Sequence, residues 1–225
     1  LNVLWVNDKV YGYSSGISRR YSVPVDTAIG LAISHDKGLT FEKYGNGPIM
    51  SATTDEPFMV GDPFVTIFDN IFHMWYIFGV RWIKNKENGA SERVYKIAHA
   101  TSIDGITWSR NGIQIIDDVI DKDECQALPT VVFHDNVYNM FFCYRSSIGF
   151  KTNKSLGYRI GYAYSKDLKT WIRDDASAGI CVSENGWDSN MQCYPHVFKV
   201  DSDIYMLYNG NEFGRYGFGL AIGEK

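Results

Sequence analysis

A proline returns every 66 residues in this chain, at Pro63, Pro129 and Pro195, and a similar run of residues surrounds each one. A fixed period of this length indicates a repeat architecture, in which each repeat forms one structural unit. After each proline come an apolar run, an acidic turn and an aromatic run, as at residues 71–76 after the turn at residues 69–70. This pattern favours two antiparallel strands joined by a tight turn.

The second half of each repeat predicts two further strands. One is a run in which small and apolar residues alternate, at residues 29–32, 96–100, 159–163 and 218–221. A polar turn and an aromatic residue follow the first three of these runs and lead into a fourth strand. Four strands per repeat are typical of a β-propeller blade, so we expect an all-β chain.

The repeat divides the chain into about four blades, at residues 1–50, 61–116, 127–182 and 193–225, and the last blade stops after its third strand. Propellers of about four to eight blades hide their sheet edges by closing on themselves. We therefore expect residues 1–225 to form a single propeller domain, with about one further blade upstream in a longer chain. The alternatives are a four-bladed closure or self-association through the open sheet edges.

The polar turn at residues 34–41 resembles the Asp-box of sialidase propellers, in which side chains of the turn hydrogen-bond the backbone of the same turn. Related turns occur at residues 102–108 and 165–171. Asp, Ser and Gly are turn-forming residues. We therefore assign the aspartates of these turns to folding rather than to catalysis.

Composition narrows the class of protein and the kind of partner. Hydrophobic residues make up 45% of the chain and aromatic residues 15%, which describes a well-packed chain rather than a disordered or fibrous one. The sequence shows no apolar run of about 18 residues and no signal-peptide pattern, so we expect no membrane anchor and a cytoplasmic location. A net charge of −4 with scattered basic residues argues against a nucleic-acid partner. The four cysteines form no C-x-x-C pair, and we expect them to be reduced.

Six stretches of the chain carry a resemblance to a known family. They are residues 24–50, Gly61-Asp62-Pro63, Asp123-Glu124, residues 158–163, Gly186-Trp187-Asp188-Ser189 and residues 208–211. Together they resemble a group of five-bladed propellers found in bacterial surface-polysaccharide gene sets. That group is similar to the glycosidase superfamily of arabinanases, invertases and mannoside phosphorylases. The resemblance implies a five-bladed β-propeller, of which this chain covers about four blades, and glycoside hydrolase activity on a polysaccharide or its precursor.

In those enzymes the catalytic carboxylates stand at the start of the innermost strands, around a funnel at one end of the propeller axis. The matching residues here are Asp62, Glu124 and Asp188, each at or shortly before a repeat proline. Glycoside hydrolysis needs one protonated and one ionised carboxyl group, so their environments must separate the two pKa values. The resemblance makes these three residues the candidate catalytic set.

The resemblance also implies a role for two of these carboxylates. Glu124 resembles the acid in the Glu-Cys pair of invertase-like enzymes, although the proline that follows directly in that pattern stands here at Pro129. Glu124 is therefore the candidate general acid. Asp62 resembles the second aspartate, which orients the substrate and tunes the acid, and the alternative is that Asp62 caps a turn. The nucleophile or base of the relatives comes from an earlier blade, and its counterpart would lie upstream of Leu1.

Candidates for substrate binding are Arg81, Trp82, Arg145, Trp187, His196, Asn209 and Asn211. Arg and Asn supply the donors that a hydroxylated or carboxylated sugar accepts, and Trp supplies a stacking face. Arg81 and Arg145 occupy similar places in consecutive blades and fit a clamp for an anion, and the alternative is that they form salt bridges to the candidate carboxylates. For Trp187 and His196 the alternative is a role in packing.

The five histidines show no metal-ligand spacing. We expect no metal and no cofactor, although some relatives hold a calcium ion in the axial channel. The expected partner is a carbohydrate, and three functions stay open: a glycoside hydrolase, a non-catalytic sugar-binding propeller, and a glycoside phosphorylase that binds phosphate through Arg81 and Arg145. A hydrolase needs two carboxyl groups about 5 to 10 Å apart across a pocket, whereas a binding protein does not.

Overall fold

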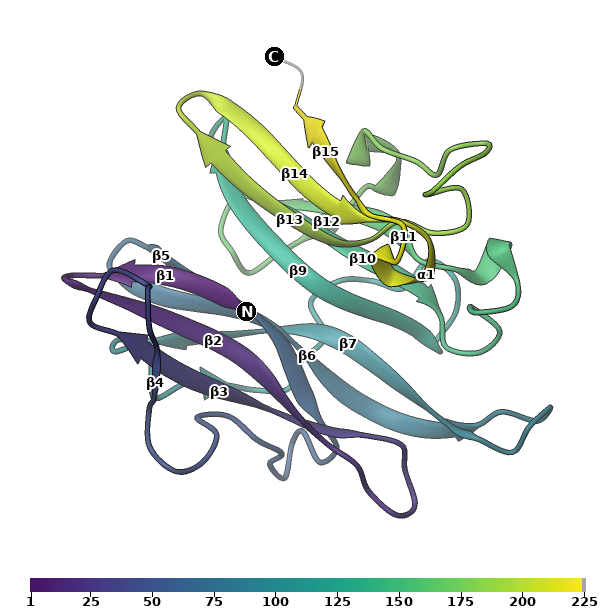
Figure 1. The fold of residues 1–225 in the computed structure, drawn as a ribbon, viewed down its shortest axis with the longest axis horizontal. Coiled ribbons are helices and arrows are strands. Elements are labelled where there is room, and N and C mark those ends of the chain that lie inside the picture. Colours follow the sequence, from purple (N-terminus) through teal and green to yellow (C-terminus); the bar gives the residue numbers. More distant parts are fainter. Residues whose placement is uncertain (224–225) are drawn as a thin grey trace. The chain divides into compact units, whose positions relative to one another are not determined.

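The computed structural model describes residues 1–223 of the chain and consists almost entirely of antiparallel β-sheet (Figure 1). Four sheets follow one another along the sequence, three with four strands and the last with three. Two compact units divide the chain, Leu1–Gln114 and the part from Ile115 onward. The all-β fold built from propeller blades is confirmed. The single domain and the further blade upstream stay predictions.

The first unit contains the sheets β1-β2-β3-β4 and β5-β6-β7-β8, in which each strand pairs with the next one along the chain. The strands are β1 (Asn2–Val6), β2 (Lys9–Ser18), β3 (Asp26–Ser34), β4 (Glu42–Lys43), β5 (Val60–Phe68), β6 (Ile71–Lys84), β7 (Ser91–Ser102) and β8 (Ser109–Arg110). Tyr13, Ile29, Met74 and Tyr76 are buried in the core of this unit. The hydroxyl of Tyr13 donates to the carbonyl of Gly105 over 2.9 Å, which ties the first sheet to the turn before β8.

The second unit contains the sheets β9-β10-β11-β12 and β13-β14-β15. The strands are β9 (Glu124–His134), β10 (Val137–Ser146), β11 (Arg159–Ser165), β12 (Ile172–Arg173), β13 (Cys193–Val200), β14 (Asp203–Asn209) and β15 (Phe218–Ile222). Three short helices accompany them, the 3-10 helices η1 (Lys154–Leu156) and η2 (Asp175–Ala178) and the helix α1 (Asn211–Gly214). Cys125, Cys143 and Cys193 are buried, Cys181 is exposed, and none of them forms a disulfide. No helix within residues 1–223 is long and apolar enough to cross a bilayer.

Two of the predicted hairpins close with left-handed residues at both central turn positions. The φ angles are 51° and 62° at Asp69 and Asn70, and 52° and 61° at Asp135 and Asn136. This is the signature of a type I′ turn, whose twist matches the twist of the flanking strands. Asp and Asn tolerate this backbone better than other residues with side chains. The local sequence therefore specifies the turn, and the hairpins predicted from it are confirmed.

The residue before each repeat proline also has a left-handed backbone. The φ angle is 50° at Asp62, 47° at Leu128 and 61° at Tyr194, values that residues other than glycine rarely adopt. A shift in strand register accompanies each of them, so the first strand of each sheet contains a β-bulge there. The same deviation in three successive sheets belongs to the blade itself. Of the three candidate catalytic carboxylates, Asp62 lies at this position, whereas Glu124 and Asp188 lie several residues before it in their own repeats.

The polar turns have the predicted folding role. In the first of them the hydroxyl of Ser34 donates to the Asp36 carboxylate over 2.7 Å, and that carboxylate accepts the backbone N–H of Thr40 over 2.9 Å. Hydrogen bonds from Thr40 and Ser34 lower the pKa of Asp36 to about 2. The turns at Asp104 and Asp167 repeat the arrangement. These aspartates therefore stabilise the turn between the third and fourth strands of the first three sheets.

Candidate functional site

Glu124, the predicted general acid, begins β9 and is fully buried. Its Oε1 accepts from Arg173 over 2.6 Å and from the side-chain amide of Gln126 over 3.1 Å. Its Oε2 accepts the backbone N–H groups of Val119 and Ile120, each over 3.0 Å. Four donors thus hold a carboxylate that has no solvent-exposed surface. Its role as the general acid stays a prediction, and these contacts provide no route from Glu124 to a substrate.

Arg173, the partner of Glu124, was not among the residues predicted to be functional. Its guanidinium lies over two aromatic rings, 5.1 Å from the centroid of Phe142 and 4.4 Å from that of Tyr144. The repeat does indicate Arg173, because Arg173 and Arg110 each stand two residues after the tryptophan of a polar turn. Arg110 forms an ion pair with Glu56, which is likewise buried. A buried glutamate paired with an arginine of the fourth strand is therefore a feature of two blades.

Asp62 lies at the start of β5, in the left-handed conformation described above, and is half-buried. Its backbone N–H donates to the hydroxyl of Ser15 over 2.8 Å. A Cβ at the neighbouring Gly61 would come within 3.2 Å of the hydroxyl groups of Ser15 and Thr27, so the chain passes close to β2 and β3 here. Of the three predicted catalytic residues, Asp62 is partly exposed to solvent, whereas Glu124 and Asp188 are buried.

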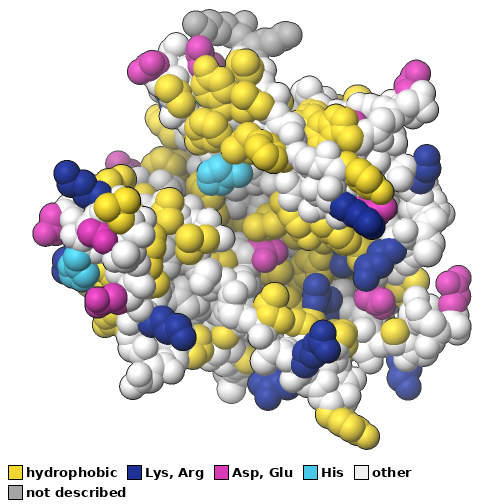
Figure 2. All heavy atoms as spheres, viewed as in Figure 1, with side chains coloured by type: hydrophobic (Ala, Val, Ile, Leu, Met, Phe, Trp, Pro, Cys, Tyr) yellow, Lys and Arg dark blue, Asp and Glu magenta, His cyan; other side chains and the backbone are white. Residues whose placement is uncertain are grey.

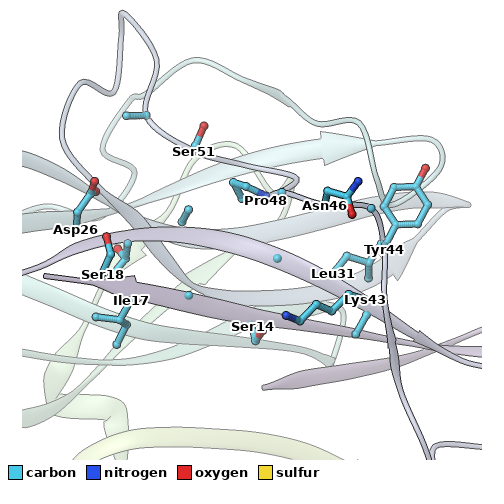
Figure 3. A pocket seen from close by; sticks show the side chains of 18 of the residues that line it. Ser14, Ile17, Ser18, Asp26, Leu31, Lys43, Tyr44, Asn46, Pro48 and Ser51 are labelled. Carbon is cyan, nitrogen blue, oxygen red and sulfur yellow. The ribbon is translucent and has the colours of Figure 1, made fainter.

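Two cavities open on the first unit. One has a volume of about 360 Å³, and Trp82, Arg20 and Asp26 are among the residues that line it. The other has a volume of about 650 Å³ and lies beside β2, β3 and the segment after β4 (Figure 3). Lys43 and Asn46 supply polar groups to its wall, together with the Arg20–Asp26 ion pair of 2.5 Å that lines both cavities. Polar groups set among small side chains suit a hydroxylated ligand.

Arg81, on β6, is half-buried and has interactions of its own with other described residues. Its predicted role as part of an anion clamp with Arg145 stays a prediction, because the two arginines belong to different units. The sequence period alone suggested the pair.

Asp188, Trp187 and Asn211 come together in the second unit. The backbone N–H of Asn211 donates to the carbonyl of Trp187 over 2.7 Å, and the indole of Trp187 stacks on Tyr208 with ring centroids 5.5 Å apart. Asp188 is 3% exposed, and its Oδ2 accepts from the side chain of Gln192 over 2.8 Å. These contacts stabilise the conformation of the loop before β13. The substrate-binding roles of Trp187 and Asn211 stay predictions.

An aromatic cluster that the sequence did not predict surrounds Arg145. The guanidinium of Arg145 lies 3.6 Å from the ring centroid of Phe150 and 5.2 Å from that of Tyr158. Phe213 packs edge-on against both rings and stacks on Tyr194 at 6.1 Å. Phe213 is 39% exposed, and Tyr194 is the left-handed residue before the repeat proline. Tyr194 thus occupies the position in its sheet that Asp62 occupies in β5. Phe213 lies in α1, between β14 and β15, where the third sheet has the 3-10 helix η1 and the first two sheets have no helix, so the period gave no signal for Phe213.

Two predicted binding residues lie on the last sheet, His196 in the middle of β13 and Asn209 at the end of β14. His196 is exposed and its ring stacks on Phe198 with centroids 6.1 Å apart. The side-chain amide of Asn209 donates to the carbonyl of Phe213 over 3.3 Å, which connects it to the aromatic cluster. Residues 1–223 contain no group of three or more His, Cys, Asp or Glu side chains placed to hold a metal ion.

Known proteins with a similar sequence come from Mycobacterium tuberculosis, and no protein-family model matches the chain. They are the uncharacterized protein MT1551 of strain CDC 1551 / Oshkosh and the uncharacterized protein Rv1502 of strain H37Rv. Each is 34% identical over 213 residues, which are 95% of this chain and 67% of the relative.

Solved structures with a similar fold include several glycoside hydrolases. The structure of a complex of BT0996 with RGII superposes with a TM-score of 0.73 at 19% identity, over 99% of this chain and 64% of that one. A thermostable family-43 glycoside hydrolase gives 0.69 at 16% identity, over 98% of this chain and 69% of that one. The Bombyx mori GH32 beta-fructofuranosidase BmSUC1 gives 0.64 at 15% identity, over 93% of this chain and 42% of that one.

The chain spans about two thirds of the length of the mycobacterial relatives and 64% of the BT0996 structure. At these low identities the solved structures establish the fold, whereas the sequence match to the mycobacterial proteins establishes relationship. This chain therefore belongs to the family of those two mycobacterial proteins and has the β-propeller fold of glycoside hydrolases.

Proposed function

We propose that this protein is a glycoside hydrolase that acts on a bacterial polysaccharide or its precursor, with Asp62 as one carboxylate of its site. The observation that carries the proposal is the position of Asp62, half-buried and left-handed at the bulge that opens β5. Leu128 and Tyr194 share this backbone, so what distinguishes Asp62 is that it places a carboxylate with partial solvent exposure at that position. The fold shared with glycoside hydrolases supports the same proposal.

A paired-carboxylate mechanism requires a second carboxyl group about 5 to 10 Å from the first. The sequence resemblance names Glu124 and Asp188 as candidates for it. The aromatic cluster around Phe213 and Tyr194 supports a carbohydrate as the ligand, because aromatic faces stack on the apolar faces of sugars. One structural neighbour, BT0996, is itself in a complex with the carbohydrate RGII, which fits a carbohydrate ligand for this fold.

A non-catalytic carbohydrate-binding protein is the second candidate. The observation that favours it is the burial of Glu124 and Asp188, whose carboxylates accept from Arg173 and Gln192. Under this proposal Phe213 and Tyr194 bind the sugar and no bond is broken. The two candidates differ in whether a glycan is cleaved once it is bound.

The test is a screen of bacterial polysaccharides for binding and for release of reducing ends, with the unaltered protein and its Asp62→Asn variant. The substitution keeps the shape of the side chain and removes its charge. Under the hydrolase proposal we expect turnover to fall at least about 100-fold while glycan binding persists. Asp69→Asn is the matched control, because Asp69 is an exposed turn residue with a similar φ angle, and it should leave turnover unchanged.

Each outcome decides between the candidates. Binding without cleavage by the unaltered protein would replace the hydrolase by the binding protein. Full turnover by Asp62→Asn would remove Asp62 from the site, and a protein that neither binds nor cleaves any glycan would contradict both candidates.

A further inference from the structure

Four segments of the first unit meet at one end of its two sheets and enclose the cavity of about 360 Å³. The loop after β2 contributes Arg20, and Asp26 begins β3. Phe58 precedes β5, and Trp82 lies two residues before the end of β6. Ligand sites for small molecules have volumes of about 300 to 1,000 Å³. The cavity therefore has room for one small ligand, or for one residue of a longer ligand.

Arg20 and Asp26 form an ion pair that leaves a donor and an acceptor for a ligand. Nε and Nη2 of Arg20 donate to Oδ2 of Asp26 over 3.0 and 2.5 Å. This pairing does not use Nη1 of Arg20 or Oδ1 of Asp26, and the two side chains are 60% and 29% exposed. A donor beside an acceptor matches two neighbouring hydroxyl groups of a sugar ring, because a hydroxyl both donates and accepts.

The rest of the wall favours an uncharged ring. Among the described residues that line the cavity, Arg20 and Asp26 alone carry a charge, and as a pair they have no net charge. Trp82 is half-buried and Phe58 is 36% exposed, so both offer aromatic surface. Aromatic faces pack against the apolar faces of sugar rings. A neutral sugar residue therefore matches the charge, the polar groups and the aromatic surface of this wall.

The loop between β2 and β3 places the cavity at the surface of the protein. The hydroxyl of Ser91, the first residue of β7, donates to the carbonyl of Ser22 over 3.4 Å and holds the loop against β7. Tyr21 of this loop also lines the cavity and is fully exposed. The loop lies at the lower edge of the view in Figure 1, and Figure 2 shows Lys and Arg side chains together with hydrophobic ones along that edge. A long glycan can therefore reach the cavity from solvent.

The cavity is close to Asp62 without including it. Phe58 stands four residues before Asp62, and an extended chain covers at most about 3.6 Å per residue, so their Cα atoms are at most about 14 Å apart. The backbone N–H of Asp62 donates to Ser15 on β2. Asp26 pairs instead with Ser18, three residues further along β2, which is about 10 Å at the rise of a strand. A ligand that occupies both places therefore contains more than one sugar residue.

We propose that this cavity is a subsite for an uncharged sugar residue other than the one held at Asp62. The indole of Trp82 stacks on the ring, and the Arg20–Asp26 pair binds two adjacent hydroxyl groups. The inference rests on the proposed function and describes its substrate more closely, as a neutral oligosaccharide or polysaccharide rather than a simple glycoside.

The test is saturation-transfer NMR on the unaltered 225-residue chain with four probes, the methyl glycosides of glucose, galactose, mannose and arabinose. We expect at least one probe to bind in the millimolar range. Trp82→Ala should weaken its binding at least about fivefold, because the stacking face is lost. Trp5→Ala is the matched control and should bind as the unaltered chain does, since Trp5 on β1 is 57% exposed and does not line the cavity.

Arg20→Met tests the polar wall at an exposed position, where the substitution does not threaten folding. It should also weaken binding at least about fivefold, because the donor for the hydroxyl is lost. Arg19→Met is its matched control and should have no effect, since Arg19 is exposed and lies outside the cavity wall.

Asp62→Asn separates this subsite from the proposed hydrolase. It should leave binding of the monosaccharide probe unchanged, because Asp62 does not line the cavity. With a glycan that the protein cleaves, Trp82→Ala should raise KM for long fragments and leave kcat/KM for the shortest cleaved fragment unchanged. Probe binding that depends on Trp82 in a protein that cleaves no glycan would support the subsite and contradict the hydrolase.

Three results would overturn the inference. The first is the absence of saturation transfer to all four probes at millimolar concentration. The second is binding that Trp82→Ala and Arg20→Met leave unchanged, or that the two control variants weaken to the same extent. The third is tighter binding of methyl glucuronoside than of methyl glucoside, which would show that the cavity takes an anionic sugar.

Discussion

Arg173 lies at the end of β12, 5% exposed at its side chain, with Glu124 and Asp175 as its ion-pair partners. Breaking a buried ion pair by removing one partner leaves an uncompensated charge inside the protein. We therefore expect Arg173→Met to lower the free energy of unfolding by about 3 to 5 kcal/mol in urea titrations. Adding Glu124→Gln to that variant should recover at least about 1 kcal/mol, because the buried charge is then gone.

The matched control for Arg173→Met is Arg215→Met. Arg215 also pairs with a glutamate, at 2.9 Å, but both side chains are more than half exposed. It should leave the free energy of unfolding unchanged, since exposed ion pairs contribute little. Equal and small effects of the two substitutions would contradict a structural role for the Glu124–Arg173 pair.

Strands and turns are the elements that the sequence predicted well. Residues 69–70 and 135–136 form the hairpin turns expected from their aspartate and asparagine, because a local rule of φ angles decides them. Glu124 was predicted as a catalytic acid, yet its partner Arg173 is 49 residues away, and no local rule connects the two. A contact between strands depends on their register. The register could be inferred here only by aligning all the blades, which places Arg173 and Arg110 at equivalent positions. Phe213 escaped prediction for another reason, since the segment between the second and third strands differs in length and structure from blade to blade.

The polar turns give a prediction at the scale of one β-hairpin. Ser102 is the buried last residue of β7, and its hydroxyl accepts the backbone N–H of Gly105 over 2.9 Å. Ser102→Ala leaves that buried N–H without an acceptor, so we expect a loss of about 1 to 3 kcal/mol in the free energy of unfolding. Ser109→Ala, at an exposed position on β8, is the control and should have no effect. If Ser102→Ala left the free energy of unfolding unchanged, the hydrogen bonds of Asp104 alone would be enough to stabilise the turn.

At the scale of the whole molecule, the period of 66 residues predicted four successive sheets but not the division into two compact units. Every repeat has the same hydrophobic pattern, so the sequence contains no reason for a boundary after Gln114 rather than after another blade. Each unit contains buried hydrophobic residues of its own, such as Met74 in the first and Met140 in the second. Unfolding of this chain is therefore best followed by a probe that reports on one unit at a time.

A pair of histidines makes the first unit sensitive to pH. His73 Nδ1 and His99 Nε2 lie 3.0 Å apart with the rings stacked, and His99 also stacks on the buried Trp75. Burial first, and then the neighbouring His73, lower the pKa of His99 to about 4 from its ordinary value of 6.5. The unfolded chain therefore takes up a proton below about pH 6.5 that the folded chain takes up only near pH 4. Stability is complete above pH 6.5 and is lost as the pH falls through this window.

We expect the free energy of unfolding of the first unit to fall by up to about 3 kcal/mol between about pH 7 and pH 4, from His99 alone. Hydrogen exchange of the β6 and β7 amides, measured across that range, reads this unit separately. His99→Gln should flatten the dependence, because its side chain does not titrate, whereas His35→Gln at an exposed turn should leave the slope unchanged. The aspartates of the polar turns do not account for such a loss, since the lowered pKa of Asp36 places its contribution at still lower pH. If the free energy of unfolding of His99→Gln still fell with pH as in the unaltered protein, another group of the first unit would cause the pH dependence. His73 would be the next residue to substitute.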